Sequence, residues 1–243
     1  MISKSQIKFV KSLQQKKYRD INKCFVVESS KNVNEIMDSD YEILHLFATK
    51  KWLELNEREI NVSVNEVNEK ELQRITSLKT ASDILAVVKM PQKDIEFDFE
   101  GVNIVLDEIK DPGNLGTIIR ICDWFGVKNI YCSDNSVDVY NSKVVQSTMG
   151  SISRVNVIYT NLRDMISNLD SNTNVYAAVM DGEDVNKVEI STNSLIVFGN
   201  ESSGVSDEIN KLISNKITIN KIGEAESLNI AVSSAIILNQ FCN

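Results

Sequence analysis

The sequence has few of the residues on which several enzyme classes depend. It contains one histidine, His45, and four cysteines with no CxxC pair. A single histidine cannot build a His-based metal site, and a Ser-His triad hydrolase is not expected either. Scattered cysteines indicate reduced thiols in a cytoplasmic protein, mostly filling the core. We therefore expect no metal centre and no disulfide framework.

Long apolar runs are also missing. No stretch of 18 or more apolar residues occurs, so no membrane-spanning helix is expected. The N-terminus lacks the apolar core of a secretory signal. With 42% apolar and 25% charged residues, the composition is that of a soluble globular protein able to bury a sizeable core.

Charge is distributed unevenly. The formal net charge of −8 argues against indiscriminate binding to nucleic acid. Residues 1–23 nevertheless carry +6, so the remaining residues sum to −14. A basic segment on an acidic body indicates either a local phosphate-binding patch or a solvated helix face, and the charges alone leave both open.

Glycine is absent from the first hundred residues, and all nine glycines lie at or after Gly101. Between the two parts, residues 91–100 begin with one of only two prolines and carry four acidic residues. Such a change of composition across an acidic, proline-led stretch predicts a domain boundary. We expect one domain over 1–92 and a second over 100–243.

Hydrophobic periodicity predicts an α/β arrangement in both parts. The first part is expected to hold helices over 5–18, 31–37 and 68–78, and strands over 24–28, 43–49, 61–64 and 84–90. The second is expected to hold strands over 102–106, 129–132, 154–159, 174–180, 195–198 and 216–219, and helices over 115–125, 139–148, 161–169, 205–214 and 227–241. This pattern gives a mostly parallel sheet, whose ligands lie beyond the carboxyl ends of its strands. Neither GxGxxG nor GxxxxGK[ST] occurs, which disfavours an ordinary dinucleotide or P-loop site.

The first informative loop follows the strand at 102–106 and reads DPGNLGTIIR. Its Pro-Gly turn leads into a helical pattern, with Asn114 well placed as the N-cap. Arg120 lies within this otherwise apolar helix, and a guanidinium is costly to bury unless it has an anionic partner. The simpler interpretation is an ordinary βα corner.

Two further loops follow later strands. In the first, Gly199 and Gly204 bracket Glu201, which could be the anionic partner of Arg120. In the second, Ser-Leu-Asn ends at Asn229 and leads into a helix that is apolar nearly all round and is expected to be buried. Asn229 and Ser233 share a face of that helix and need polar partners, which could be each other, the backbone or a ligand.

Together the three loops resemble the sequence motifs of the SpoU (TrmH-like) RNA ribose 2′-O-methyltransferases of the SPOUT superfamily. The patterns DPxNxGxxxR, GxExxG and SLN are matched in this order from 111 to 229, and the stretch 144–155 resembles the family's Ser-x-x-Gly segment. The resemblance covers residues 102–241. Residues 1–90 resemble, more weakly, the family's L30e-like substrate-binding domain.

The resemblance implies a trefoil-knotted methyltransferase domain with a parallel sheet, preceded by a small L30e-like α/β domain. It implies S-adenosylmethionine as the cofactor, structured RNA as the substrate, and a homodimer formed through the C-terminal domain with the site at the subunit interface. The implied catalytic residues are Asn114, Arg120, Glu201, Ser227 and Asn229. The implied cofactor-binding residues are Phe198, Gly199, Ile219, Leu228 and Asn229, and the expected RNA-binding residues are Lys8, Lys11, Lys16, Lys17 and Arg19.

The implied reaction is methyl transfer to a ribose 2′-hydroxyl, with loss of the hydroxyl proton. In the family the arginine matched by Arg120 is the suggested base, but a guanidinium stays protonated in proteins. We therefore expect Arg120 to bind the RNA phosphate or to stabilise the developing alkoxide, with Glu201 fixing its rotamer, and the hydroxyl proton to pass to that phosphate or to water. Asn114 would hold the ribose or orient Arg120.

The sequence departs from the family pattern at two places. Asn220 follows Ile219 where a proline is common, and Ser29 follows Glu28 where glycine is common. Two alternatives stay open: a non-catalytic RNA-binding or ribosome-assembly protein that keeps the fold, and a related knotted enzyme that methylates a base. The extra N-terminal domain favours ribosomal RNA slightly over transfer RNA.

Overall fold

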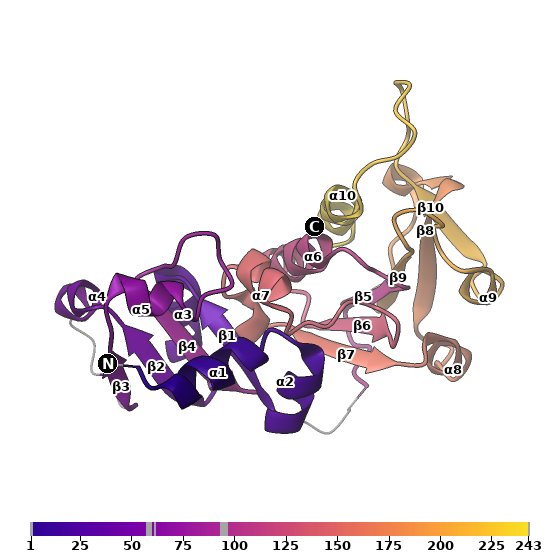
Figure 1. Ribbon diagram of the computed structural model, residues 1–243. Coiled ribbons are helices and arrows are strands. Elements are labelled where there is room, and N and C mark those ends of the chain that lie inside the picture. Colours follow the sequence, from indigo (N-terminus) through magenta and orange to yellow (C-terminus); the bar gives the residue numbers. More distant parts are fainter. Residues whose placement is uncertain (1, 57–59, 61, 93–96, 243) are drawn as a thin grey trace. The chain divides into compact units, whose positions relative to one another are not determined.

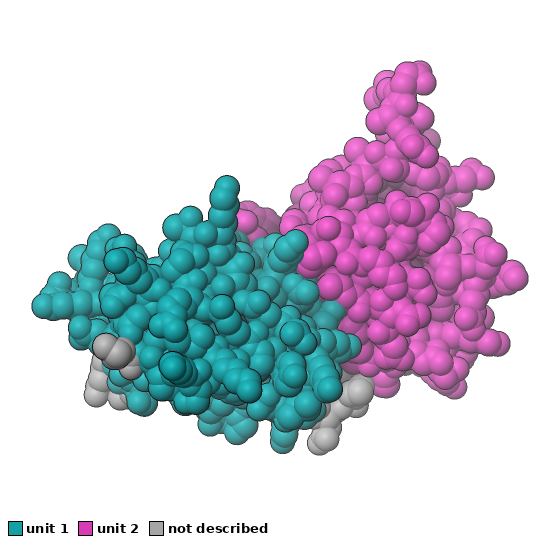
Figure 2. Space-filling model, viewed as in Figure 1, with its two compact units in different colours: residues 1–93, 138–153 teal, residues 94–137, 154–243 magenta. Residues whose placement is uncertain are grey.

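The computed structural model describes residues 2–242 except 57–59, 61 and 93–96 (Figure 1). The chain forms two compact units, shown in different colours in Figure 2. Unit 1 comprises residues 1–93 and 138–153, and unit 2 comprises residues 94–137 and 154–243. The chain therefore enters unit 1 twice.

Unit 1 is built on a four-stranded mixed sheet with the strand order β1-β4-β2-β3. The central pairs β1–β4 and β4–β2 are antiparallel, whereas β2–β3 is parallel. Strand β1 is buried along its whole length. The elements are α1 (Lys4–Ser12), α2 (Lys16–Asn22), β1 (Cys24–Glu28), α3 (Ser30–Met37), β2 (Ile43–Ala48), α4 (Lys50–Leu55), β3 (Val64–Glu66), α5 (Glu69–Gln73), β4 (Ile84–Lys89) and α7 (Ser142–Thr148), with a 3₁₀ turn η1 (Ser151–Ser153).

The stretch 138–153, which we expected within the second domain, packs into unit 1. The ring of Tyr140 lies 4.6 Å from that of Phe25, between centroids, and Tyr41 donates a hydrogen bond to the Ile152 carbonyl. Gly150 has φ +101°, and a Cβ atom there would lie 2.4 Å from Glu35 Cγ. The glycine is therefore required for the close approach of this stretch to α3.

Unit 2 is built on a six-stranded parallel sheet with the strand order β10-β8-β9-β5-β6-β7. The predicted parallel sheet is thus confirmed. The elements are β5 (Val102–Leu106), α6 (Pro112–Phe125), β6 (Asn129–Ser133), β7 (Asn156–Thr160), α8 (Leu162–Ser167), β8 (Asn174–Asp184), η2 (Val185–Lys187), β9 (Ser194–Phe198), α9 (Asp207–Asn210), β10 (Asn215–Thr218) and α10 (Ile230–Phe241).

Strand β5 lies at the centre of this sheet, between β9 and β6. Its apolar run Ile104-Val105-Leu106 is fully buried, as expected for a parallel strand covered on both faces. After β10, at one edge of the sheet, the chain runs back toward the centre, and α10 packs against α6 (Figure 1). The topology therefore places the ends of β5 and β9 next to each other and brings the start of α10 to the start of α6.

Several predicted elements differ in extent. The expected helix over 5–18 is two helices, because Gln15 is extended and interrupts the helical backbone. Helix α4 was not predicted, and α9 is much shorter than the expected 205–214. Residue 61 of the expected strand at 61–64 lies outside the described residues, and β3 begins at Val64.

Two further findings apply to the described ranges 2–56, 60, 62–92 and 97–242. No helix there is both long enough and apolar enough to cross a membrane. No group of three or more His, Cys, Asp or Glu side chains there is arranged to hold a metal ion.

Candidate active site

The first loop begins where β5 ends. Asp107 N–H donates to the Phe198 carbonyl at 2.9 Å, which continues the pairing of β5 with β9. Helix α6 then starts at Pro112, and its N-cap is Asp111, whose Oδ1 accepts from Asn114 N–H at 2.8 Å. The prediction that Asn114 is the N-cap is wrong, because a proline at the first helical position follows a capping aspartate. The Asn114 side chain is therefore free for other contacts.

A chain of amide hydrogen bonds joins all three loops. Asn229 Nδ2 donates to Asn114 Oδ1 at 3.0 Å, and Asn114 Nδ2 donates to Glu201 Oε1 at 2.9 Å. Asn229 also caps α10, since its Oδ1 accepts from Ala231 N–H at 2.9 Å. Three of the five expected catalytic residues are thus in direct contact, although 115 residues separate Asn114 from Asn229.

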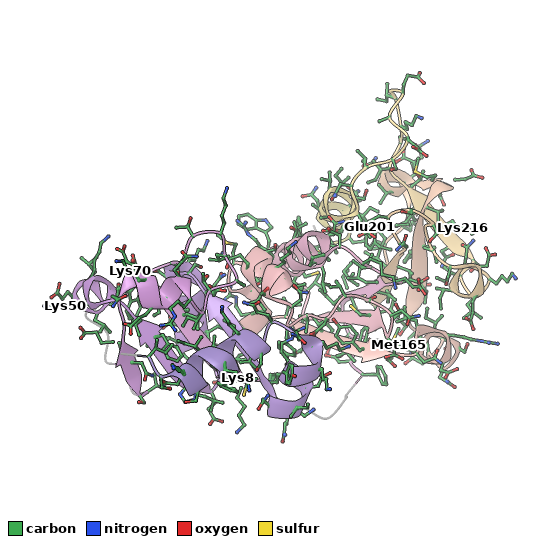
Figure 3. All side chains as sticks on the ribbon, viewed as in Figure 1. Lys8, Lys50, Lys70, Met165, Glu201 and Lys216 are labelled. Carbon is green, nitrogen blue, oxygen red and sulfur yellow. The ribbon has the colours of Figure 1, made fainter. Side chains whose placement is uncertain are left out.

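The second loop is tightly folded. Gly199 approaches the next turn so closely that a Cβ atom would lie 2.0 Å from the Gly204 backbone, and Gly204 itself has φ +71°. Asn200 and Gly204 exchange two main-chain hydrogen bonds of 2.9 Å. Both glycines are therefore needed for a turn that presents Glu201, labelled in Figure 3, at its exposed tip.

The third loop is extended and exposed. Residues 221–229 are all exposed, and Figure 1 shows the stretch between β10 and α10 projecting from the sheet. Within the described part of the chain, the main-chain groups of residues 220–228 form no main-chain hydrogen bonds. Ser227 and Leu228 belong to this stretch, and Ser227 is not part of the amide chain.

The other expected cofactor-binding residues lie at the ends of two strands. Phe198 ends β9 and is buried, Gly199 follows it, and Ile219 follows β10. Strand β8 separates β9 from β10 in the sheet. The assignment of these residues to a cofactor stays a prediction.

Arg120 does not occupy the expected position. It is exposed on α6, and the expected pair with Glu201 is not formed, since Glu201 accepts from Asn114 instead. Arg120 follows Asn114 by six residues, which places the two side chains about 120° apart around the helix axis, on different faces of α6. The expectation of a buried guanidinium paired with Glu201 is therefore wrong for the isolated chain.

Arg120 shares its face of α6 with an unusual apolar side chain. Trp124, four residues later, is 84% exposed. On the neighbouring helix α10, Val232 and Ile236 are 49% and 41% exposed. The prediction that α10 is buried is therefore wrong for one face, because α6 and the sheet cover only the other.

The expected RNA-binding residues divide into two groups. Lys8 and Lys11 are exposed on α1, and Lys16 and Lys17 are exposed on α2 (Lys8 is labelled in Figure 3). Arg19 is only 2% exposed. Its guanidinium is occupied by structural hydrogen bonds within unit 1, so the expectation that it contacts RNA is wrong.

The sequence analysis did not identify two residues that matter for the site, Asp111 and Asn200. Asp111 could have been recognised as the cap from the Asp-Pro pair at the helix start. Asn200 joins two loops through its side-chain amide, which accepts from Ser202 N–H at 2.9 Å and donates to the Glu108 carbonyl at 2.8 Å. An asparagine just after a strand is typical of such a turn, but its second partner has no local signal.

Comparison with known proteins identifies this arrangement. The family model described as "SpoU rRNA Methylase family" matches residues 101–239, more than half of the chain. The chain belongs to the SpoU rRNA methylase family. A second model, "MRM3-like substrate binding domain", matches residues 4–86. The two matches leave between them the stretch in which the composition changes.

Relatives of this SpoU family member extend over its whole length. The 23S rRNA (guanosine(2553)-2′-O)-methyltransferase RlmP of Bacillus subtilis is 27% identical over 235 residues, covering 96% of this chain and 94% of its own. A structure assigned to the TrmH family of RNA methyltransferases, from Porphyromonas gingivalis, has a TM-score of 0.89 and 33% identity over 99% of this chain and 98% of its own. The AdoMet-bound rRNA methyltransferase of Sinorhizobium meliloti has a TM-score of 0.86 and 27% identity, with coverage of 99% and 95%.

Proposed function

We propose that this protein transfers a methyl group from S-adenosylmethionine to a ribose 2′-hydroxyl of ribosomal RNA. The observation that carries the proposal is the hydrogen-bonded chain Asn229–Asn114–Glu201, which draws the three SpoU motifs together at one edge of a parallel sheet. The family match and the full-length similarity to RlmP, an rRNA 2′-O-methyltransferase, support it.

The chain offers a suitable cradle for the cofactor. The main-chain N–H and C=O groups of residues 220–228 are without main-chain partners in the described structure, so they are available to the polar groups of a ligand. Phe198 and Leu228 would contribute apolar contact. Bound S-adenosylmethionine supplies a methyl group on a positively charged sulfur. The relative from S. meliloti binds the same molecule.

The side chains of the amide chain would position the acceptor. Asn114 uses one oxygen and one N–H within the chain and retains a second N–H and a second lone pair, which can hold the ribose hydroxyl. Glu201 fixes the orientation of the Asn114 amide. Holding the hydroxyl in line with the donor is the larger part of catalysis in such a transfer.

A homodimer would complete the site. Trp124 on α6 and Val232 and Ile236 on α10 are exposed apolar side chains of two packed helices, which favours burial of these helices against a second copy of the chain. Arg120 shares its face of α6 with Trp124 and would enter the partner's site, where its guanidinium can bind an RNA phosphate or stabilise the alkoxide.

The remaining parts of the proposal concern the two domains. The C-terminal domain would carry a trefoil knot, which the family membership and the return of α10 across the sheet support. The N-terminal domain, over 1–92, would be L30e-like and bind RNA through Lys8, Lys11, Lys16 and Lys17. Their phosphate contacts would position RNA without reading its sequence.

The test is a methyl-transfer assay with the full chain. The purified protein is incubated with S-adenosylmethionine labelled on the methyl group and with ribosomal RNA from cells that lack its gene, and the RNA is digested to nucleosides. We expect label in a 2′-O-methylnucleoside. Asn114→Ala should lose about 100-fold in rate, because the acceptor is no longer held in place. Asn172→Ala, at an exposed turn of the same unit, is the control and should keep full activity.

Three results would contradict the proposal. Label in a base instead of a ribose would indicate the base-methylating alternative. Binding of RNA and cofactor without transfer would indicate the non-catalytic alternative. Full activity of Asn114→Ala would remove the role given to the amide chain.

A further inference from the structure

The main chain of Glu108 connects three neighbouring strands at their carboxyl ends. Glu108 follows β5 and has a φ of 58°, in the left-handed region that a non-glycine residue adopts only at an energetic cost. Its N–H donates to Ser133 Oγ at the end of β6, at 2.8 Å. Its C=O accepts from Asn200 Nδ2, beyond the end of β9, at 2.8 Å. Side chains from both neighbouring strands thus hold the strained residue.

Asn200 also organises the loop to which it belongs. Its Oδ1 accepts from Ser202 N–H at 2.9 Å and from Ser203 N–H at 3.3 Å. Its main chain exchanges two hydrogen bonds with Gly204. One side-chain amide therefore ties the whole 199–204 turn to the backbone of the loop after β5.

The two connected loops carry Glu201 and Asn114, which are hydrogen-bonded to each other in the amide chain. Glu201 directly follows Asn200, and Asn114 lies six residues after Glu108. We propose that Asn200 is a positioning residue for methyl transfer: its bond to the Glu108 carbonyl sets the place of Glu201 relative to Asn114. This inference rests on the proposed function. Asn200 itself need not touch the substrate.

The substitution Asn200→Asp removes the side-chain donor to the Glu108 carbonyl but keeps the side-chain acceptor within the 199–204 turn. The new carboxylate keeps the oxygen that accepts from Ser202 and Ser203, and it has nearly the same shape. It replaces the N–H donor with an oxygen that faces the Glu108 carbonyl, so two acceptors repel and the loops move apart. Protonation of the carboxylate restores a donor, and the defect should therefore shrink as the pH is lowered.

The experiment measures kcat, KM for RNA, and Tm as a function of pH for the wild-type protein and its variants. For Asn200→Asp we expect kcat about 100-fold below wild type at alkaline pH, since small misplacements cost this much, and KM for RNA within about twofold. The ratio of variant to wild-type kcat should rise toward acid pH. Asn168→Asp is the matched control, because Asn168 Nδ2 also donates to a main-chain carbonyl, that of Asp164, at 2.8 Å, on the exposed end of α8. Its kcat should equal that of the wild type at every pH.

Glu108→Gln tests whether the carboxylate has a role of its own. It leaves both main-chain hydrogen bonds of residue 108 in place and removes the negative charge that pairs with Lys110 at 3.7 Å, so this variant should retain wild-type kcat. Loss of activity in Glu108→Gln would assign the role to the carboxylate and overturn the inference. Wild-type kcat in Asn200→Asp, or a defect that is the same at every pH, would also overturn it. An active wild-type enzyme in those cases leaves the proposed function standing, whereas an inactive wild-type protein overturns both.

Discussion

Arg19 offers a sharp test of how this fold is held together. Its guanidinium is buried and donates from Nη1 to the carbonyls of Leu13 and Gln14, at 2.9 and 3.0 Å. From Nε and Nη2 it donates to Asp138 Oδ2, at 3.1 and 2.5 Å. Arg19 thus closes the turn between α1 and α2 and anchors α2 to the stretch 138–153. We expect Arg19→Met to destabilise unit 1 strongly.

The magnitude follows from what the substitution leaves behind. The Asp138 side chain is 15% exposed and would keep the Tyr140 N–H, which donates to its Oδ1 at 3.0 Å, but its largely buried charge would lose its cationic partner. Removing one member of a buried ion pair costs about 3–5 kcal/mol. At about 4 °C per kcal/mol for a unit of roughly 100 residues, the Tm of unit 1 should fall by about 15 °C.

The two tryptophans of the chain make the assay selective. Trp52 is buried in unit 1, and Trp124 is exposed in unit 2. In a Trp124→Phe background, fluorescence during urea unfolding reports unit 1 through Trp52 alone. Lys89→Met is the matched control in the same unit: Lys89 pairs with Glu42 on the surface at 2.7 Å, and an exposed pair contributes at most about 1 kcal/mol.

One outcome would refute the structural role of Arg19. If Arg19→Met unfolds at the same urea concentration as Lys89→Met but lowers the salt dependence of RNA binding, Arg19 acts as a phosphate contact and the structural role is refuted. The structural role requires the reverse: a large loss of stability, and a salt dependence unchanged in the variant that remains folded.

Three further predictions concern single features. Burial raises the pKa of Cys122 and Cys132, so both thiols stay protonated at neutral pH and should react with an aromatic disulfide reagent only after unfolding, whereas the partly exposed Cys242 should react first in a timed titration. Trp124→Glu places a charge on the exposed apolar face and should convert a dimer into monomers in sedimentation velocity; an unchanged sedimentation coefficient would contradict a dimer through this face. Replacing Lys8 and Lys11 with alanine should lower the slope of log affinity for RNA against log salt by about two, without changing the Tm.

Much of the unit 2 framework could be predicted from the sequence. The run Ile104-Val105-Leu106 and the helical spacing after Pro112 are local signals, and the structure follows them closely. The motif order also predicted that distant loops would meet, as Asn114 and Asn229 do. Local patterns suffice here because parallel strands place their carboxyl ends at one edge whatever the loops contain.

The environment of the two arginines could not be predicted in this way. Arg120, inside an apolar helix, is exposed, and Arg19, among exposed lysines, is buried. The burial of Arg19 depends on Asp138, which lies 119 residues away in the sequence and belongs to the second segment of unit 1, residues 138–153. Periodicity reports which face of a helix is apolar, but it does not report what covers that face.

The spacing within the first motif would allow one helix to serve two sites. Asn114 faces inward to Glu201 and Asn229, whereas Arg120 projects on another face beside Trp124. On a straight helix the two side chains point about 120° apart and their positions differ by about 9 Å along the axis, which disfavours contact of both with one small substrate. If both act in methyl transfer, this separation favours their acting in different sites. A pair of chains related by a two-fold axis provides such sites, since each chain then gives its asparagine to one site and its arginine to the other. Mixing Arg120→Ala with Asn114→Ala subunits should then restore transfer, because one of the two sites in a mixed dimer holds both wild-type residues.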